Sequence, residues 1–426
     1  PIGTQFRKGR NNSVKAEPGD LGSPWAIGAA EGGHTAIHPD LGNFEDFDAL
    51  VEAAKVNGME LALDIAFQCA PDHPWVTEHP DWFKSRPDGT IQYAENPPKK
   101  YQDIYPLNFE SPDWRGLWDA LLGVFTFWIE RGVKVFRVDN PHTKALPFWE
   151  WCIAEIHKDA PEVLFLAEAF TRPHVMYSLA KGGYTQGYTY FTWRQTKKDL
   201  EEYFTEICNP PVRDFYRPNV WPNTPDILHA QLQVGDPAER RSVFIQRAVL
   251  AATLSANWGI YGPAYELCEW RPAKPAAGKK GSEEYLDSEK YQIRAWDRAD
   301  PISIAPVITE LNKIRRENVA LQRNERLHFH KTENEQILCY SKSSEDGLNT
   351  ILVVVNLDPT AEQTAWMQLR LDHLGVPWDA EFEVEDLLTG ARFTWKEWCY
   401  VALKPELPAH VLRVVTPPTA ALTMEA

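Results

Sequence analysis

The sequence predicts an α/β protein, a (β/α)8-type barrel that is followed by an all-β sandwich. Over the first two thirds of the chain, short apolar runs alternate with amphipathic stretches, which is typical of parallel strands covered by helices. From about residue 326, strand-like runs follow one another between turn signals, which indicates an antiparallel sandwich. Acidic residues stand where apolar runs end, and a barrel carries its chemistry at the carboxyl ends of its strands.

The barrel domain is assigned to residues 1–325. Its first predicted strand is the apolar run at 60–67 (ELALDIAF). This run reads as a buried strand after a predicted helix. In chain order, three helix–strand pairs are expected: helix 44–57 with strand 60–67, helix 114–130 with strand 133–138, and helix 148–157 with strand 163–167. Three more strands are expected at 188–192, 215–220 and 257–261.

Residues 68–111 interrupt this alternation directly after a predicted strand. They are rich in Pro, Trp, Asp and His, and so long an excursion within a compact domain is usually functional. We expect an insert there. The sandwich is assigned to 326–418, with a frayed tail at 419–426. Its expected strands are 337–340, 350–356, 368–371, 381–386, 400–403 and 410–415.

Composition narrows the classes of function. The 426 residues include 60 acidic and 44 basic ones, which gives a net charge of −16. This charge argues against a protein that binds nucleic acid, and against one that binds an anionic membrane surface. The 17 Trp, 15 Tyr and 19 Phe suit a protein that stacks rings on sugars, and they equally suit a large core. No signal peptide is visible, and six scattered cysteines without metal or redox spacing suggest a reducing, cytoplasmic location.

Carboxylates stand where the predicted strands end. Asp64 lies within the first strand, Asp139 and Glu168 directly follow two later ones, and Asp226 lies in a later loop. Arg137 shares a strand face with Asp139, because residues two apart point the same way. Converging carboxylates suggest glycosidic chemistry, with one ionised nucleophile and one protonated acid. A magnesium or calcium site and simple helix capping are alternatives that the residues alone leave open.

Two segments carry a family resemblance. Residues 136–144 (FRVDNPHTK) and 165–173 (FLAEAFTRP) resemble signature segments of the α-amylase superfamily, and more narrowly of its α-1,4-glucan:maltose-1-phosphate maltosyltransferase branch. The resemblance extends over essentially the whole chain. The other matching segments are 6–12 (FRKGRNN), 22–28 (GSPWAIG), 32–39 (GGHTAIHP), 68–76 (QCAPDHPWV), 96–110 (NPPKKYQDIYPLNFE) and 289–297 (EKYQIRAWD).

The resemblance implies a retaining double displacement on a maltosyl unit. It makes Asp139 the nucleophile, Glu168 the general acid and then base, and Asp226 the carboxylate that stabilises the transition state. Arg137 would keep Asp139 ionised. The implied donor is maltose 1-phosphate, the acceptor is the non-reducing end of a malto-oligosaccharide or α-1,4-glucan, and phosphate leaves.

The resemblance also implies a set of substrate-binding residues. Those matching the donor site are Lys8, Gln68, Asp103, Asn140, Lys290 and Tyr291. Asn96 and Tyr101 lie in the segment that resembles the phosphate pocket, where a leaving phosphate needs hydrogen-bond donors and positive charge. Trp25, Trp75 and Trp193 are candidates for stacking on sugar rings. The amylase calcium pattern is not evident, so we expect no metal and no cofactor.

Departures from the superfamily pattern are informative. Gln68 and Cys69 stand where ordinary amylases have Asn and His, and Thr224 and Pro225 precede Asp226 in place of another Asn-His pair. These differences favour the transferase branch over a plain α-glucan hydrolase, and the retained carboxylates disfavour a non-catalytic glucan-binding protein. Residues 1–3 match the end of the family's second barrel strand. We therefore expect two barrel strands and the N-terminal domains of a homodimeric parent to lie outside this sequence, which leaves activity of the chain alone in question.

Overall fold

The computed structural model describes residues 9, 15, 17–18, 20, 27–28, 30, 32–96, 99–274, 281–286 and 294–415, without the side chains of residues 40, 96 and 99. The chain divides into two compact units. The first comprises residues 1–188 and 286–294, and the second comprises residues 189–285 and 295–426. The predicted boundary at residues 325 and 326 stays a prediction.

A parallel sheet forms the centre of the first unit. Its strands follow the order β1 (Ala62–Ile65), β6 (Val135–Asp139), β7 (Leu164–Glu168) and β8 (Gln186–Tyr188). Each neighbouring pair is parallel. Parallel strands need crossover connections, and helices supply them. The sheet therefore brings the carboxyl ends of all four strands to one edge.

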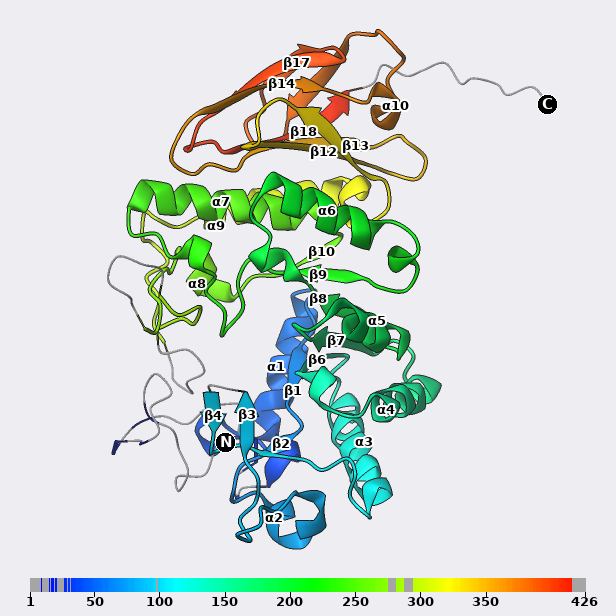
Figure 1. Cartoon of the computed structure of the whole chain (residues 1–426), viewed down its shortest axis with the longest axis vertical. Helices are drawn as coiled ribbons and strands as arrows, with labels where there is room; N and C mark the ends of the chain where they lie inside the picture. The colour runs from blue at the N-terminus through cyan, green and yellow to red at the C-terminus, as the bar shows by residue number, and fades with distance from the viewer. Residues whose placement is uncertain are drawn as a thin grey trace, which may run out of the picture. The chain divides into compact units, whose positions relative to one another are not determined.

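Helices connect these strands, and Figure 1 shows α3, α4 and α5 following one another along one side of β6 and β7. In α3, Leu117, Leu121, Val124, Phe125 and Trp128 are buried at helical spacing and join the core of this unit. The Asp113 carboxylate caps the helix by accepting from Gly116 N–H at 3.2 Å. The helices of this unit are α1 (Phe44–Val56), α2 (Pro74–Glu78), α3 (Trp114–Glu130), α4 (Leu146–Asp159) and α5 (Pro173–Lys181), with single 3-10 turns at Gly33–Thr35, Pro39–Leu41, Pro80–Trp82 and Pro141–Thr143.

The segment between β1 and α3 folds into two small antiparallel pairs. One joins β2 (Gln68–Cys69) to β5 (Tyr105–Pro106), and the other joins β3 (Ala94–Asn96) to β4 (Lys99–Tyr101). Two-residue strands have few backbone bonds of their own. The aromatic side chains of Trp82 and Phe83, which are buried in the main core of the unit, fix the segment to the sheet.

The second unit contains two further parallel strands, β9 (Pro218–Val220) and β10 (Asn257–Trp258). Its helices are α6 (Lys197–Cys208), α7 (Pro237–Leu254), α8 (Gly262–Glu266), α9 (Ala305–Glu317) and α10 (Leu371–Leu374), with 3-10 turns at Tyr190–Trp193, Val212–Asp214, Ala230–Leu232 and Val319–Gln322. Residues 242–254 of α7 are buried all round, because α9, β10 and β13 all pack against this helix. Figure 1 shows α6 and α7 lying between β9 and the C-terminal sheet.

Eight antiparallel strands complete the second unit, in the order β16-β15-β18-β13-β12-β11-β14-β17. Their bounds are β11 (Leu327–Thr332), β12 (Ile337–Ser343), β13 (Thr350–Asn356), β14 (Gln363–Gln368), β15 (Phe382–Asp386), β16 (Arg392–Trp395), β17 (Trp398–Leu403) and β18 (Ala409–Val415). In β17, buried Cys399, Val401 and Leu403 alternate with exposed residues, so one face of the strand belongs to the core. The other face lies in solvent.

Two predicted strands differ from the structure. Residues 190–193 form a 3-10 turn, because the Arg247 guanidinium binds the carbonyl oxygens of Phe191 (2.6 Å) and Arg194 (2.7 Å) and draws the chain inward. The strand expected at 368–371 lies earlier, at Gln363–Gln368, and Leu371–Leu374 is a helical turn with both leucines buried. Short apolar runs do not by themselves distinguish a strand from a buried turn.

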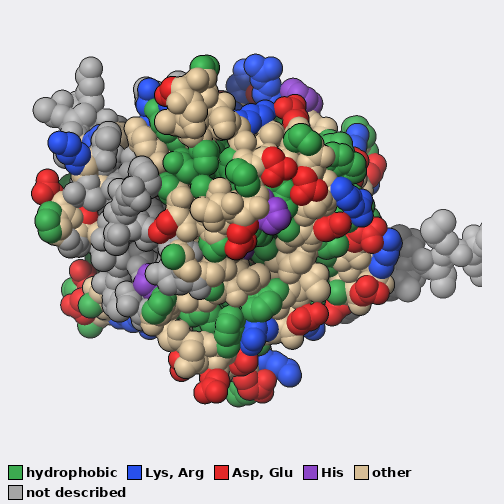
Figure 2. All heavy atoms as spheres, turned by 90° about the horizontal axis from the view of Figure 1, so that it is seen from below, with side chains coloured by type: hydrophobic (Ala, Val, Ile, Leu, Met, Phe, Trp, Pro, Cys, Tyr) green, Lys and Arg blue, Asp and Glu red, His purple; other side chains and the backbone are tan. Residues whose placement is uncertain are grey.

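Charged side chains of both signs are interspersed over the face shown in Figure 2, in keeping with an acidic protein whose basic residues are not gathered into one area of that face. Among the described residues, no helix is both long and apolar enough to cross a bilayer. All six cysteines are described, and each is a buried free thiol.

Candidate active site

The carboxylates predicted to act on substrate end two neighbouring strands of the first unit. Asp139 is the last residue of β6 and Glu168 is the last residue of β7, and the two are partners in the parallel register. Register partners on a sheet point to the same face, so both side chains leave the sheet together. They are buried, with exposed fractions of 8% and 5%. The structure therefore brings this predicted pair together.

Arg137 joins the carboxylates of three strands. Its Nη1 lies 3.6 Å from Asp139 Oδ1, and its Nη2 lies 3.5 Å from Glu168 Oε1. Its Nε lies 3.4 Å from Asp64 Oδ1 on β1. Burial disfavours the charge of this guanidinium, but the Glu168, Asp64 and Asp139 carboxylates outweigh burial and raise the Arg137 pKa above its ordinary value. A permanently charged guanidinium thus holds the two site carboxylates in place.

Asn140 adopts a left-handed conformation immediately after β6, with φ 43° and ψ 53°. Asn tolerates this region better than most residues. The turn aims the backbone N–H of Asn140 at Glu168 Oε2, 3.2 Å away. The side-chain amide donates to Asp139 Oδ1 at 3.2 Å. One residue therefore contacts both carboxylates, through its backbone and through its side chain.

Lys144 secures this turn from the other side. Its ammonium donates to the carbonyl oxygens of Asp139 (3.3 Å) and Asn140 (3.2 Å). Burial lowers the pKa of Lys144, and the nearby Asp139 and Glu168 carboxylates oppose that shift. The Trp149 indole N–H binds the Pro141 carbonyl oxygen at 3.0 Å and ties the same turn to α4. The turn after β6 is thus fixed by donors from outside it.

Two more side chains complete the surroundings of the pair. Gln68 on β2 donates through Nε2 to Asp139 Oδ2 at 3.5 Å. The Tyr188 ring at the end of β8 lies 5.9 Å from Arg137 Cζ, within the range of a cation–π contact. Burial raises the pKa of the Tyr188 phenol above its ordinary value, with Arg137 acting in the opposite direction. Gln68 was expected at this site, whereas Tyr188 was not.

The remaining predicted donor residues lie on the β3–β4 hairpin or outside the described residues. Tyr101 ends β4, and Asp103, two residues later, is buried. Asn96 belongs to β3, and the structure does not describe its side chain. Lys8, Lys290 and Tyr291 lie outside the described residues, as does Trp25. The structure places Tyr101 and Asp103 in the same unit as Asp139, at the end of β4 and in the turn that follows it.

Asp226 belongs to the second unit, on the loop that follows β9. Its Oδ1 accepts from the Thr224 hydroxyl at 2.8 Å, and that hydroxyl oxygen also accepts from Ile227 N–H at 3.1 Å. The neighbouring Asn223 is fully buried, donates to Tyr285 OH at 2.8 Å and accepts from Tyr261 N–H at 2.9 Å. The loop therefore has a defined conformation within its own unit, with Asp226 half-buried.

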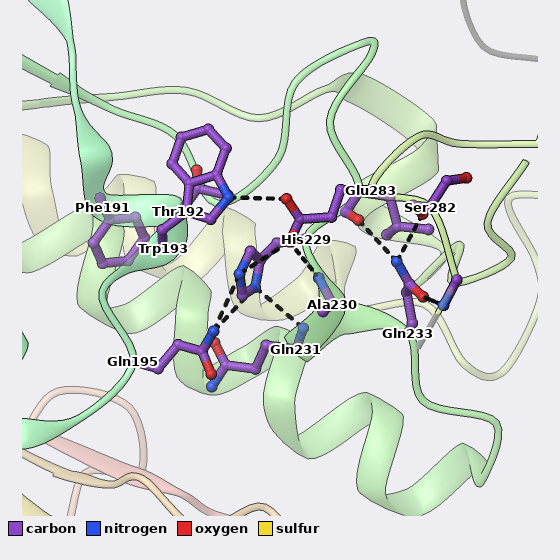
Figure 3. A network of polar contacts seen from close by, with 12 residues as sticks. Phe191, Thr192, Trp193, Gln195, His229, Ala230, Gln231, Gln233, Ser282 and Glu283 are labelled. Atoms are coloured by element: carbon purple, nitrogen blue, oxygen red, sulfur yellow. Dashed lines mark hydrogen bonds and ion pairs between the residues drawn. The ribbon is translucent and has the colours of Figure 1, made fainter. Parts of the chain in front are cut away.

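A polar network anchors the end of this loop, as Figure 3 shows around His229 and Glu283. Glu283 accepts from the Trp193 indole N–H at 3.0 Å and lies 3.3 Å from His229 Nε2. His229 Nδ1 accepts from Gln231 N–H at 3.1 Å. Burial lowers the pKa of His229 to about 4, against the opposing effect of Glu283. Trp193, a stacking candidate, is thus committed to Glu283 through its indole nitrogen.

A group of possible metal ligands lies beside Gln68. The ligand atoms of His34, Cys69 and His73 lie within 4.8 Å of one another. His73 Nδ1, however, accepts from Trp75 N–H at 3.0 Å, which places the imidazole proton on Nε2. Burial lowers the pKa of His73 to about 4, lowers that of His34 well below its ordinary value and raises that of the Cys69 thiol. The group therefore consists of neutral side chains, and Trp75 packs against both histidine rings.

Comparison with known proteins identifies relatives over almost the whole chain. A 425-residue alignment with the α-1,4-glucan:maltose-1-phosphate maltosyltransferase of Chlorobaculum tepidum is 56% identical and covers 98% of this chain and 62% of the relative. The enzyme of that name from Methylacidiphilum infernorum is 52% identical, over 97% of this chain and 61% of the relative. The chain is a homologue of these maltosyltransferases over almost its whole length. A family profile described as "GLGE, C-terminal" also matches residues 329–414.

Solved structures establish the fold of this chain. The α-amylase of Lactobacillus plantarum has a TM-score of 0.69 at 18% identity, over 97% of this chain and 89% of the amylase. The acarbose-bound α-amylase of Geobacillus thermoleovorans has a TM-score of 0.68 at 16% identity, over 97% and 87%. The predicted fold class, a (β/α) barrel with a following all-β sandwich, is confirmed. The chain spans about 60% of the length of the relatives that it matches.

Three contributors to the site were not predicted as site residues. Asp64 was noted only as a strand-end acid, and its ion pair with Arg137 depends on the β1–β6 register. Lys144 lies in the FRVDNPHTK segment, and its position five residues after Asp139 was a usable signal. Tyr188 ends a strand that was expected to begin there, so its neighbourhood was not apparent from the sequence.

Proposed function

We propose that this chain carries the chemistry of a retaining maltosyltransferase. In this proposal a maltosyl unit moves from maltose 1-phosphate to the non-reducing end of an α-1,4-glucan, and phosphate is released. The observation that carries the proposal is the Asp139–Glu168 pair. The register of β6 and β7 places the two residues side by side, Arg137 pairs with both carboxylates, and Gln68 and Asn140 contact them. The names of the relatives support the substrate class.

The proposed mechanism has two balanced displacements. Asp139 attacks the anomeric carbon of the maltosyl unit, the bond from that carbon to the phosphate oxygen breaks, and Glu168 protonates the leaving oxygen. The acceptor hydroxyl then gives its proton to Glu168 and attacks the same carbon, which frees Asp139. Two inversions retain the α configuration. Asp226 would stabilise the positive charge that develops on the sugar ring in each transition state.

We infer that Gln68, Tyr101, Asp103 and Asn140 help to bind the donor, together with Lys8, Asn96, Lys290 and Tyr291. Support comes from the two contacts to Asp139, at 3.5 Å from Gln68 and 3.2 Å from Asn140. The proposed partners are the donor, the glucan and phosphate, in a homodimer that acts in the cytoplasm, where six buried reduced thiols are stable. We also propose the domain division at residue 325 and the sandwich at 326–418.

Phosphate release tests this proposal. Maltose 1-phosphate and maltohexaose are supplied to the protein, and inorganic phosphate and chain length are followed together. We expect one phosphate per maltosyl unit transferred, and no reaction in Asp139→Asn. Release of reducing sugar from starch without any phosphorylated donor would assign an α-glucan hydrolase instead. Glucan binding without turnover, unchanged in Asp139→Ala, would assign a non-catalytic binding protein.

A further inference from the structure

Three exposed aromatic side chains lie together on the C-terminal sheet. Trp366 on β14 and Tyr400 on β17 are directly opposite in the antiparallel register, and Trp398 lies two pairs further along, opposite Gln368. Their exposed fractions are 49%, 52% and 49%, although rings of this size are usually covered. We call Trp366, Trp398 and Tyr400 the aromatic platform. A cluster of this kind marks a binding surface more often than a single exposed ring does.

The platform borders a hollow of about 390 Å³. The Trp366 and Tyr400 rings lie 5.5 Å apart at an angle of 61°, in edge-to-face contact. Glu333, Asn334 and Glu335, from the turn after β11, also line the hollow, and we call these three residues its wall. All of these residues belong to the second unit. Aromatic rings beside polar side chains are a usual composition of an oligosaccharide site.

Hydrogen bonds fix the wall before any ligand binds. The Asn334 amide donates to Gln363 Oε1 (2.9 Å) and to the Thr364 carbonyl oxygen (3.0 Å), while its own oxygen accepts from Gln336 N–H (2.8 Å). Glu333 N–H donates to the Trp366 carbonyl oxygen at 3.1 Å. The turn and the ring-bearing strand are thus joined by their backbones, so little ordering is required on binding.

The charges around the hollow favour a neutral ligand over an anionic one. Its wall contains two carboxylates, Glu333 and Glu335, and the nearby Lys197 ammonium is committed to Thr332 (2.8 Å to Oγ1) and to Glu335 (3.8 Å). This environment repels a phosphorylated sugar and suits a neutral one, whose hydroxyls donate to carboxylates while its C–H face packs on a ring.

We propose that the aromatic platform is a second glucan-binding site, which holds the neutral polymer away from the reacting carboxylates. This inference rests on the proposed function for its choice of glucan. The site would raise the local concentration of chain ends for long acceptors, and it would leave short acceptors and the phosphorylated donor unaffected.

The test is affinity electrophoresis of the protein in native gels that contain amylopectin. We expect Trp366→Ala and Tyr400→Ala to weaken retardation at least fivefold, and Trp366→Phe to keep most of it. Trp378→Ala, at an exposed tryptophan with a 79% exposed fraction elsewhere in the same unit, is the matched control and should behave as the wild type. Circular dichroism melts of each variant verify folding.

Activity gives the second measurement. With glycogen as acceptor, Trp366→Ala should raise KM about fivefold at unchanged kcat, while maltotetraose kinetics stay the same. Undiminished retardation in the Trp366→Ala and Tyr400→Ala variants would overturn the proposal, as would a change from dimer to monomer in light scattering, which would assign the platform to a subunit contact. If maltose 1-phosphate is not a donor, the gels still report on the platform, so the two proposals fail separately.

Discussion

Asp139 and Glu168 are register partners at the ends of adjacent parallel strands, and a single guanidinium, that of Arg137, lies within 3.6 Å of both carboxylates. Backbone pairing sets the position of each Cα, and the ion pairs set the rotamers. The site is therefore organised before a substrate binds, which is what electrostatic stabilisation of a transition state requires.

Arg137→Lys should reduce kcat/KM by about 100-fold or more, because a single ammonium cannot contact three carboxylates as a guanidinium fork does. Steady-state kinetics measure this loss. Arg131→Lys, at a peripheral ion pair with Asp48 (3.2 Å), is the control and should keep the wild-type kcat/KM.

Asn140→Gly and Asn140→Ala separate the two contacts that Asn140 makes. Both variants lose the amide that donates to Asp139, but only Ala is strained at φ 43°, by about 1 kcal/mol. We expect Gly to retain the backbone bond to Glu168 and to be several-fold more active than Ala. Equal kinetics and equal unfolding midpoints for the two variants would contradict the role assigned to the left-handed turn.

Lys144→Met should lower kcat by roughly 10- to 100-fold, because the turn that positions Asp139 and Asn140 loses the donor to two carbonyl oxygens. The matched control is Lys158→Met on α4, where an exposed lysine pairs with Glu155 at 2.7 Å. Calorimetric melting separates a local effect from unfolding. A variant with wild-type kcat would show that Lys144 has no positioning role.

Lys342 makes stability depend on pH. Its ammonium on β12 is buried, without a hydrogen-bond partner among the described residues, and burial lowers its pKa from 10.5 to about 7, with Arg315 adding to the effect. Between those values the unfolded chain holds a proton that the folded protein lacks, so the free energy of unfolding rises with pH from about 7 to 10. The destabilisation is complete below pH 7.

Lys342→Met should therefore stabilise the protein at pH 7 by about 1–3 kcal/mol. This is part of the roughly 5 kcal/mol that a pKa shift from 10.5 to about 7 represents, at about 1.4 kcal/mol per unit. The gain should shrink as the pH approaches 10. Urea unfolding at pH 7 and 9.5 measures it, with Lys331→Met, an exposed lysine on β11, as control. A pH-independent difference between Lys342→Met and the wild type would contradict the explanation.

Much of the fold could be predicted from sequence patterns. The helix at 114–130 has apolar residues at helical spacing and an Asp cap, and the structure contains it with the same bounds. The turn at residues 190–193 could not be predicted, because it depends on Arg247, more than fifty residues later. Local sequence patterns indicate periodicity, whereas hydrogen-bond donors from distant parts of the chain determine the conformation of short aromatic segments.

For the same reason, some residues of the candidate site could be predicted from the sequence and others could not. Arg137, Asp139 and Glu168 could be placed together because parallel strands align their carboxyl ends. Gln68 lies 71 residues from Asp139, and only the family resemblance indicated it. The left-handed turn at Asn140 and the backing by Lys144 involve backbone groups, for which side-chain patterns contain no signal.

Covalent trapping tests the central claim most directly. Glu168→Ala is incubated with an α-maltosyl fluoride that has a second fluorine on the reacting ring, because fluoride leaves without an acid and the added fluorine slows the second displacement. Peptide mapping by mass spectrometry then locates the label. We predict one fluoromaltosyl group on Asp139 and none in the Asp139→Asn background. A label on any other residue would contradict the assignment of Asp139 as the nucleophile.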